Sequence, residues 1–257
     1  MDEILELLKQ RRFVEIYGLR TIDKNFMTRE EMIAIFDHFD AFWEYDGPPT
    51  AQRTHAKLKS EKHSNGFIAC KNVLQKTLMC KIFGLEIFKR LPVELNGFPL
   101  DKIDVVVSSA YSAITLGYEV SSLISKKNPN VEYIPVEKDK DDKPTVIRGG
   151  IDPSKNVLII NELMTTGGGS TWETKQAVLK CNGEGNPVPN IIEPAIVLIH
   201  RSKDWELIDG SKVRPIFHFD MEDWDVPNGE ECPLCKAGSE AIKPKVGNNW
   251  NLIHGRV

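Results

Sequence analysis

The chain has 257 residues, of which 41% are hydrophobic and 27% charged, and its formal net charge is -4. This composition is typical of a globular protein with a core large enough for one α/β domain and a small appended subdomain. It excludes a basic surface for nucleic acid, and no run approaches the roughly 18 apolar residues of a membrane helix. The acidic start MDEILELLKQRR lacks the order of a signal peptide. We therefore expect a cytoplasmic protein without nucleic-acid or membrane partners.

The cysteines give little sign of a metal or of disulfides. There are five, an odd number spread along the chain, which favours reduced thiols. Only Cys232 and Cys235 lie close together, and a structural metal site usually needs four ligands. His218 and His254 are weak additional candidates. We therefore expect no metal here, and instead the start of a C-terminal helix with one thiol buried.

Two helices are predicted in the first hundred residues. Thr28 and Glu31 have the spacing of a capping box, and apolar residues follow at helical spacing. We expect this helix to end before the turn that begins at Gly47. A polar segment over residues 46–66 reads as a loop, and a second helical pattern over residues 72–91 ends at Pro92. The apolar residues of the first helix are Met32, Ile35, Phe36, Phe39 and Trp43.

After residue 100 the chain alternates between strands and helices. Helices are predicted over residues 112–125 and 170–181. Short apolar runs separated by helices favour a parallel sheet that is covered on both faces. Ligands of such sheets bind beyond the carboxyl ends of the strands. The predicted strands are residues 103–107, 131–136, 157–160, 195–199 and 213–217.

The stretch NVLIINELMTTGGGSTWET, residues 156–174, predicts an anion site. A buried strand leads into a glycine-rich loop and then a helix start, so backbone N–H groups and the positive end of the helix dipole converge. A phosphate is the natural ligand. The charged segment over residues 137–150 leaves the same edge of the sheet, where its lysines can fold over a bound phosphate. The alternative is a solvated surface hairpin.

The segment over residues 157–173 resembles the phosphoribosyl-pyrophosphate (PRPP) loop of type I phosphoribosyltransferases. Both have four apolar residues, a polar pair, two more apolar residues and then Thr-Thr-Gly-Gly. The resemblance covers about residues 55–244 in the family's order and is greatest to the orotate phosphoribosyltransferases. Four further segments carry it, namely residues 58–74, 103–120, 133–151 and 231–245.

The resemblance implies an α/β fold of the type I phosphoribosyltransferase kind. A central parallel sheet is flanked by helices and carries a small hood subdomain. Residues 1–55 would form an N-terminal helical extension, and residues 56–257 the phosphoribosyltransferase-like domain with its hood and C-terminal tail. The resemblance also implies a homodimer whose mobile loops cross into each other's sites.

The implied activity is transfer of ribose 5-phosphate from PRPP to a pyrimidine or related base, with release of pyrophosphate and with Mg²⁺ as cofactor. The transition state of this family resembles an oxocarbenium ion, which nearby carboxylates stabilise. By resemblance, Glu162 and Asn161 occupy the acidic-pair positions at the ribose. Lys138 and Lys140 are the candidate catalytic lysines of the mobile loop, where they assist the leaving group.

The remaining implied roles concern PRPP and the base. The base would lie against Lys62, Phe67 and Trp172, and His63 and Ser64 are further polar neighbours. No protein metal ligand is implied. The implied PRPP-binding residues are Thr165, Thr166, Gly167, Gly168, Gly169, Ser170, Ser108, Ser109, Lys143 and Arg148.

Three positions depart from the family pattern. Asn161 stands where the family has a carboxylate, and the glycine-rich pyrophosphate loop is replaced by residues 108–113, SSAYSA. The position of an arginine that contacts orotate is Thr171 or Trp172. Two alternatives follow: a phosphoribosyltransferase for a different base, and a non-catalytic regulatory protein that binds PRPP or a nucleotide.

Overall fold

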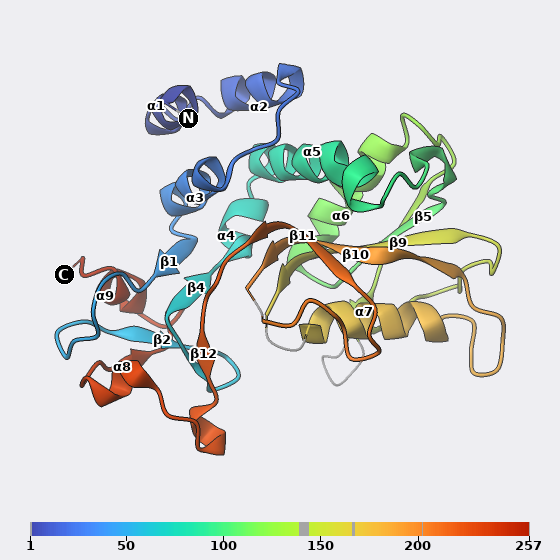
Figure 1. Cartoon of the computed structure of the whole chain (residues 1–257). Coiled ribbons are helices and arrows are strands. Elements are labelled where there is room, and N and C mark those ends of the chain that lie inside the picture. The colour runs from blue at the N-terminus through green and yellow to red at the C-terminus, as the bar shows by residue number, and fades with distance from the viewer. Residues whose placement is uncertain (1, 139–143, 166–167, 202, 257) are drawn as a thin grey trace.

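The computed structural model describes residues 2–138, 144–165, 168–201 and 203–256. Its centre is a five-stranded parallel sheet of order β11-β10-β9-β5-β6 (Figure 1). The sheet confirms the predicted α/β class and the positions of all five predicted strands. Its strands are β5 (Val105–Ser108), β6 (Glu132–Pro135), β9 (Asn156–Met164), β10 (Asn190–His200) and β11 (Val213–His218).

Helices cover both faces of the sheet, because alternate side chains of each strand point to opposite sides. In β9, Val157 and Ile159 pack in the cluster that includes residues of α7. Leu158 and Ile160 join the larger cluster on the other face, beneath α5 and α6. Figure 1 shows α5 and α6 on one side of the sheet and α7 on the other. The bounds are α5 (Thr77–Glu94), α6 (Ser112–Ile124) and α7 (Gly169–Lys180).

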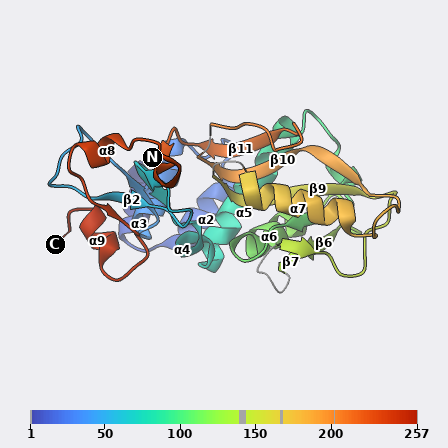
Figure 2. The same ribbon diagram turned by 90° about the horizontal axis from the view of Figure 1, so that it is seen from below.

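A second, four-stranded sheet forms the hood, with strand order β12-β3-β2-β13. It lies at the end of the molecule away from the parallel sheet, together with α8 and α9 (Figure 2). A short antiparallel pair, β1 (Phe42–Glu44) with β4 (Gly66–Ile68), adjoins it. The hood elements are β2 (His55–Lys57), β3 (His63–Ser64), β12 (Asp223–Trp224), α8 (Pro233–Lys236), β13 (Ala241–Ile242) and α9 (Asn249–Ile253).

The N-terminal segment consists of helices that share the main core. Buried side chains of α1, α2 and α3 belong to the same cluster as those of α5 and the sheet. The division of the chain at residue 55 therefore stays a prediction. Within the described ranges, no helix combines the length and the apolarity needed to cross a bilayer. The three helices are α1 (Asp2–Lys9), α2 (Phe13–Ile22) and α3 (Arg29–His38).

The predicted capping box is confirmed, whereas the predicted end of its helix is wrong. Thr28 Oγ1 accepts from the Glu31 backbone N–H at 3.2 Å, and Glu31 Oε2 accepts from the Thr28 N–H at 2.9 Å. The helix ends at His38 because Asp40 adopts a left-handed φ of 49° and turns the chain into β1. Trp43 therefore lies in a strand, where its indole packs with the hood.

Three other boundaries differ from the sequence prediction. The predicted helix over residues 72–91 is two helices, α4 (Cys70–Leu74) and α5. Helix α5 continues past Pro92 to Glu94, because Leu91 and Leu95 on either side of this turn are buried. The polar segment over residues 46–66 contains β2 and β3 of the hood. Strand β9 continues to Met164 because its pairing with β10 extends to that residue.

A buried charge network joins the N-terminal helices to α5. Glu86, only 1% exposed, accepts from Arg20 at 2.9 Å and from Arg90 at 2.9 Å. Its Oε1 also accepts from the backbone N–H of Met27 at 2.8 Å. One carboxylate thus neutralises two guanidinium groups and satisfies the turn that leads into α3.

We expect Glu86→Ala to lower the free energy of unfolding by about 3–5 kcal/mol, because it removes the most deeply buried counter-charge of Arg20 and leaves that guanidinium with Asp23 and Glu31. Glu94→Ala, in the last turn of the same helix, serves as a matched control with an expected change within about 0.5 kcal/mol. Urea denaturation of both variants measures the difference. A loss below about 1 kcal/mol for Glu86→Ala would show that the network adds little to stability.

Candidate active site

The polar residues singled out from the sequence meet at the carboxyl edge of the parallel sheet. Ser108 ends β5, Asn161 and Glu162 lie in the neighbouring strand β9, and α7 begins at Gly169. Ser109 follows β5 directly, and its hydroxyl donates to Asn161 Oδ1 at 2.6 Å. The topology therefore brings together segments about 50 residues apart, at the edge where such sheets bind ligands.

Asn161 is a fully buried cross-link between three elements. Its Oδ1 accepts from Ser109 Oγ at 2.6 Å and from the Glu162 backbone N–H at 2.9 Å. Its Nδ2 donates to Ser170 Oγ at 2.9 Å and to Thr171 Oγ1 at 2.7 Å. An amide side chain has two donors and one acceptor with two lone pairs, so protein groups use its whole capacity. Asn161 fixes the start of α7 against the ends of β5 and β9.

Glu162 is the ionisable group of this edge. Its side chain is half-buried, and burial raises the pKa of its carboxyl to about 7, against the lowering effects of its backbone N–H, the Ser109 hydroxyl and the positive charge of Lys245. A carboxyl with a pKa near neutrality responds strongly to a nearby positive charge. A nearby positive charge would therefore favour its ionised form.

Exposed residues flank the connection between β9 and α7. Thr165, Gly169 and Ser170 are exposed there, while the Gly168 N–H donates to the Thr165 carbonyl at 3.0 Å. Gly168 has a left-handed φ of 63°, and a Cβ on it would lie 2.8 Å from Leu207. The exposed residues at the N-terminus of α7 fit an anion site. Thr166 and Gly167 lie outside the described residues.

The serines of the predicted pyrophosphate loop point into the protein. Ser108 is fully buried and its Oγ hydrogen-bonds to the Tyr133 hydroxyl at 2.7 Å. Ser109 is held by Asn161. Tyr111 is 66% exposed with a left-handed φ of 66°. The exposed part of this loop therefore begins after Ser109.

Two short strands of the charged segment pair antiparallel near the same edge. Strand β7 (Glu137–Lys138) pairs with β8 (Pro144–Val146). The ammonium of Lys138 lies 4.4 Å from the centre of the Tyr111 ring, which places β7 beside the start of α6. Arg148 forms an exposed ion pair with Glu137 at 2.8 Å. The predicted residues Lys140 and Lys143 lie outside the described part of the chain.

Two adjoining pockets lie between the hood and this edge, with volumes of about 570 and 420 Å³. Both are lined by Lys71, Gln75 and Lys245, and the smaller one also by Phe67, whose ring lies 5.5 Å from the Lys245 ammonium. Sequence reasoning selected Phe67 but missed both lysines. Lys245 stands in a segment that carries the family resemblance, so its position was a usable signal.

The two other predicted base-binding residues make different contacts. Lys62 lies 3.6 Å from Asp223 and 3.5 Å from Asp225, and so ties β3 to the β12 segment of the hood. Trp172 packs against the cluster that contains Met164 and Leu207. Its side chain therefore supports the turn into α7. The roles inferred for these residues stay predictions.

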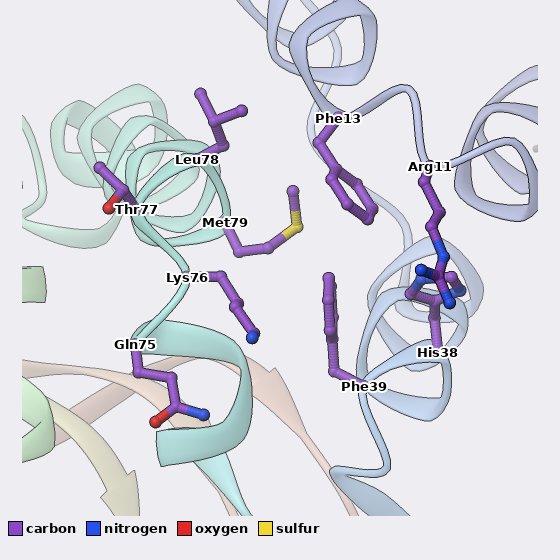
Figure 3. Close-up of a pocket in the computed structure, with 9 residues that line it drawn as sticks. All are labelled: Arg11, Phe13, His38, Phe39, Gln75, Lys76, Thr77, Leu78 and Met79. Carbon is purple, nitrogen blue, oxygen red and sulfur yellow. The ribbon is translucent and has the colours of Figure 1, made fainter.

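A larger pocket of about 630 Å³ lies between the N-terminal helices and the α4–α5 junction. Figure 3 shows Phe13, Phe39 and Met79 pointing toward one another across it. It shares only Gln75 with the pockets beside the hood. The pocket of about 570 Å³, unlike this one, is lined by Tyr111 and Ser112 of the segment that follows β5, so we place the candidate active site at the sheet edge.

Comparison with known proteins agrees with this geometry. The fold is that of the type I phosphoribosyltransferases: orotate phosphoribosyltransferase from Aeropyrum pernix superposes with a TM-score of 0.50 at 16% identity, over 72% of this chain and 92% of that one. No family model matches the chain.

Sequence comparison with curated proteins identifies the family of this chain. Orotate phosphoribosyltransferase from Pelotomaculum thermopropionicum is 30% identical over 220 residues, which is 85% of this chain and 97% of that protein. The one from Caldanaerobacter subterraneus subsp. tengcongensis is 27% identical with the same coverage. The chain therefore belongs to the orotate phosphoribosyltransferase family.

Glu162→Gln should change how stability depends on pH. Because the pKa of Glu162 is raised from 4.5 to about 7, the folded protein holds this proton more tightly than the unfolded chain does. The resulting stabilisation is complete below about pH 4.5 and is lost as the pH rises through 7. We expect the variant to match the parent near pH 4.5 and to exceed its free energy of unfolding by about 1–3 kcal/mol at pH 8. Urea denaturation of both proteins between pH 4.5 and 8 measures this difference in the free energy of unfolding. A difference that does not change with pH would contradict the raised pKa of Glu162.

Proposed function

We propose that this protein transfers ribose 5-phosphate from PRPP to orotate or a closely related pyrimidine, with release of pyrophosphate. The observation that carries the proposal is the position of Glu162 beside the open turn into α7, at the carboxyl edge of the sheet. A sugar phosphate bound there would present its phosphate to the helix N-terminus and its ribose to the carboxylate. The relatives named orotate phosphoribosyltransferase support it.

In this proposal each element has a separate task. The exposed amides and hydroxyls of Thr165, Gly169 and Ser170 bind the 5′-phosphate. Asn161 acts as a positioning residue, because its four hydrogen bonds hold Glu162, Ser109 and α7 in place. Glu162 stabilises the positive charge that develops on the ribose as pyrophosphate leaves. The β7–β8 hairpin, with Lys138, closes over the leaving group and excludes water.

The Glu162 carboxylate at this edge fits the Mg²⁺ that the reaction would require. Glu162 brings a carboxylate oxygen to this edge, whereas the Ser109 hydroxyl, 3.4 Å from Glu162 Oε2, is buried and donates to Asn161. Hard oxygen donors of this kind suit Mg²⁺, which usually takes few protein ligands and several from substrate phosphates and water. When bound, the ion would neutralise the diphosphate. We propose that Glu162 is its protein ligand.

The smaller pocket beside the hood favours an anionic base, and the positive charge of its Lys245 also acts on Glu162. Lys71 and Lys245 both line it, and the aromatic face of Phe67 forms part of its wall. A carboxylate on the base can pair with an ammonium there, while the ring stacks on Phe67. These lysines supply the positive charge that is missing at Thr171 and Trp172. Orotate is therefore favoured over a neutral pyrimidine.

A second candidate is a regulatory protein that binds PRPP or a nucleotide without turnover. The specific observation in its favour is Asn161, a neutral and fully buried amide at a family acidic position. In that case Glu162 alone would face the ribose. A homodimer, inferred from the resemblance, accords with either candidate and stays a prediction.

The proposal is tested by titrating the full chain with Mg²⁺ and PRPP in a calorimeter, and by assaying pyrophosphate release with orotate, uracil and adenine. We expect saturable PRPP binding and turnover that is fastest with orotate. Binding without turnover of any base would support the regulatory candidate. Turnover that is fastest with another base would overturn the choice of orotate, and absence of PRPP binding would overturn both candidates.

Lys245→Ala should raise the KM for orotate about tenfold or more, since a hydrogen bond to a charged group contributes about 1.5–3 kcal/mol. The KM for uracil, which lacks the carboxylate, should change less than twofold. Lys243→Ala is the matched control, because Lys243 lies two residues away and pairs with Glu61 at 2.6 Å. Equal effects on orotate and uracil would show that Lys245 does not recognise the carboxylate.

A further inference from the structure

We propose that the hood holds a structural Zn²⁺ ion, bound by His55, His63, Cys232 and Cys235. One ligand atom from each of these residues lies within 4.8 Å of every other, and together they form a potential metal site. His55 comes from β2, His63 from β3, and the two cysteines from the start of α8. The site lies in the hood and not at the sheet edge. The proposal therefore does not depend on the proposed transferase activity.

The distances between the ligand atoms match a tetrahedral zinc site. Zn–N bonds of about 2.0 Å and Zn–S bonds of about 2.3 Å place ligand atoms roughly 3.3–3.8 Å apart at tetrahedral angles. Here His55 Nε2 lies 3.1 Å from His63 Nδ1 and 3.6 Å from each of the two sulfurs. His63 Nδ1 lies 3.2 Å from Cys235 Sγ. A small expansion of the cluster accommodates the ion.

The hydrogen bonds around His55 direct a lone pair into the cluster. Ser239 Oγ donates its proton to the Arg53 carbonyl at 2.6 Å. It therefore accepts from His55 Nδ1–H at 2.8 Å, which leaves Nε2 unprotonated and facing the cysteines. A second hydrogen bond of this kind fixes the tautomer and orientation of zinc-binding histidines. His55 is completely buried, so its orientation is fixed before metal binds.

The hood has a structural need for such an ion. Its four strands have only two or three residues each, and its apolar cluster has three buried members, Trp43, Ala56 and Ile253, with partly buried side chains packed around them. A core this small contributes little to stability, and small subdomains often rely on metals. The ion would join β2 and β3 to α8, whose sequence positions differ by about 170 residues, and so hold the wall that carries Phe67 and Lys245.

Donor chemistry selects zinc among the common metals. Two thiolates and two imidazoles in tetrahedral geometry favour Zn²⁺ and disfavour Mg²⁺ and Ca²⁺, which prefer oxygen. The sequence prediction of no metal rested on His218 and His254 as the only additional candidates. His218 instead contacts His200 at 2.8 Å, at the end of the parallel sheet. The predicted helix start with one buried thiol is confirmed at α8.

Metal analysis of the full chain, produced with Zn²⁺ in the medium, tests the proposal. We expect about one zinc per chain after extensive dialysis, and removal by a strong chelator should lower the unfolding midpoint by about 5–10 °C. Replacement by Co²⁺ should give the intense visible bands of a tetrahedral ion and thiolate-to-metal charge transfer. Less than about 0.1 zinc per chain, a different metal at full occupancy, or Co²⁺ bands without thiolate character would overturn the proposal.

Cys235→Ser is the most informative variant, because Cys235 is exposed and its replacement leaves the packing intact. We expect it to bind zinc at least about 100-fold more weakly than the parent. Cys181→Ser, which changes a half-buried thiol after α7, is the matched control and should retain one zinc. Equal zinc content in the two variants would contradict the assignment.

A measurement on the parent alone avoids any effect of a variant on folding. Alkylation of the native protein, followed by mass spectrometry of its peptides, reports which thiols react. We expect Cys235 to be protected in the protein as purified and to react at least about tenfold faster after chelation, because zinc-bound thiolates are shielded from the reagent. Rapid reaction of exposed Cys235 before chelation would contradict a bound ion.

Discussion

The Asn161 amide holds the candidate active site together. It joins the end of β5, strand β9 and the first turn of α7 through four hydrogen bonds. Removing any partner would leave a buried polar group unsatisfied, which costs about 1–3 kcal/mol. The glycine-rich turn therefore starts and ends at fixed points. This rigidity pre-organises both the N-terminus of α7 and the adjacent carboxylate of Glu162.

The hydrogen bonds of Asn161 explain why an amide can stand where the family has a carboxylate. A carboxylate at position 161 could accept four hydrogen bonds but could donate none when ionised. The amide accepts on one side and donates on the other, which suits a serine on β5 and two hydroxyls on α7. It also avoids a second negative charge beside Glu162, whose pKa burial already raises to about 7. Chemistry at the ribose is thus concentrated on one carboxylate.

Local patterns were sufficient to predict the parallel sheet, its helices and the edge where the polar residues meet. The buried runs of β5 and β9 and the capping box at Thr28 are short-range signals of this kind. The hood was not predictable in detail, because its strands have two or three residues and pair across sequence separations as large as that between His55 and Ala241. His55 and His63 were missed as metal ligands for the same reason. Lys71 and Lys245 were missed because their shared pocket brings together residues far apart in the sequence.

The hood and the sheet have complementary tasks in this account. The sheet edge offers fixed backbone groups and one carboxylate to a sugar phosphate. We propose that zinc stabilises the hood. The hood region supplies the Phe67 ring and Lys245, which come from segments far apart in the sequence. Arg201 links the two, since this buried side chain follows β10 and donates to the Gly66 carbonyl and the Ser64 hydroxyl, each at 2.7 Å.

The most direct measurement is a crystal structure of the full chain with Mg²⁺ and PRPP bound. The account predicts that the 5′-phosphate lies at the turn between Thr165 and Ser170, with backbone N–H groups at about 2.9 Å, and that a ribose hydroxyl lies at a similar distance from Glu162. PRPP bound away from this turn, or a ribose that does not approach Glu162, would contradict it.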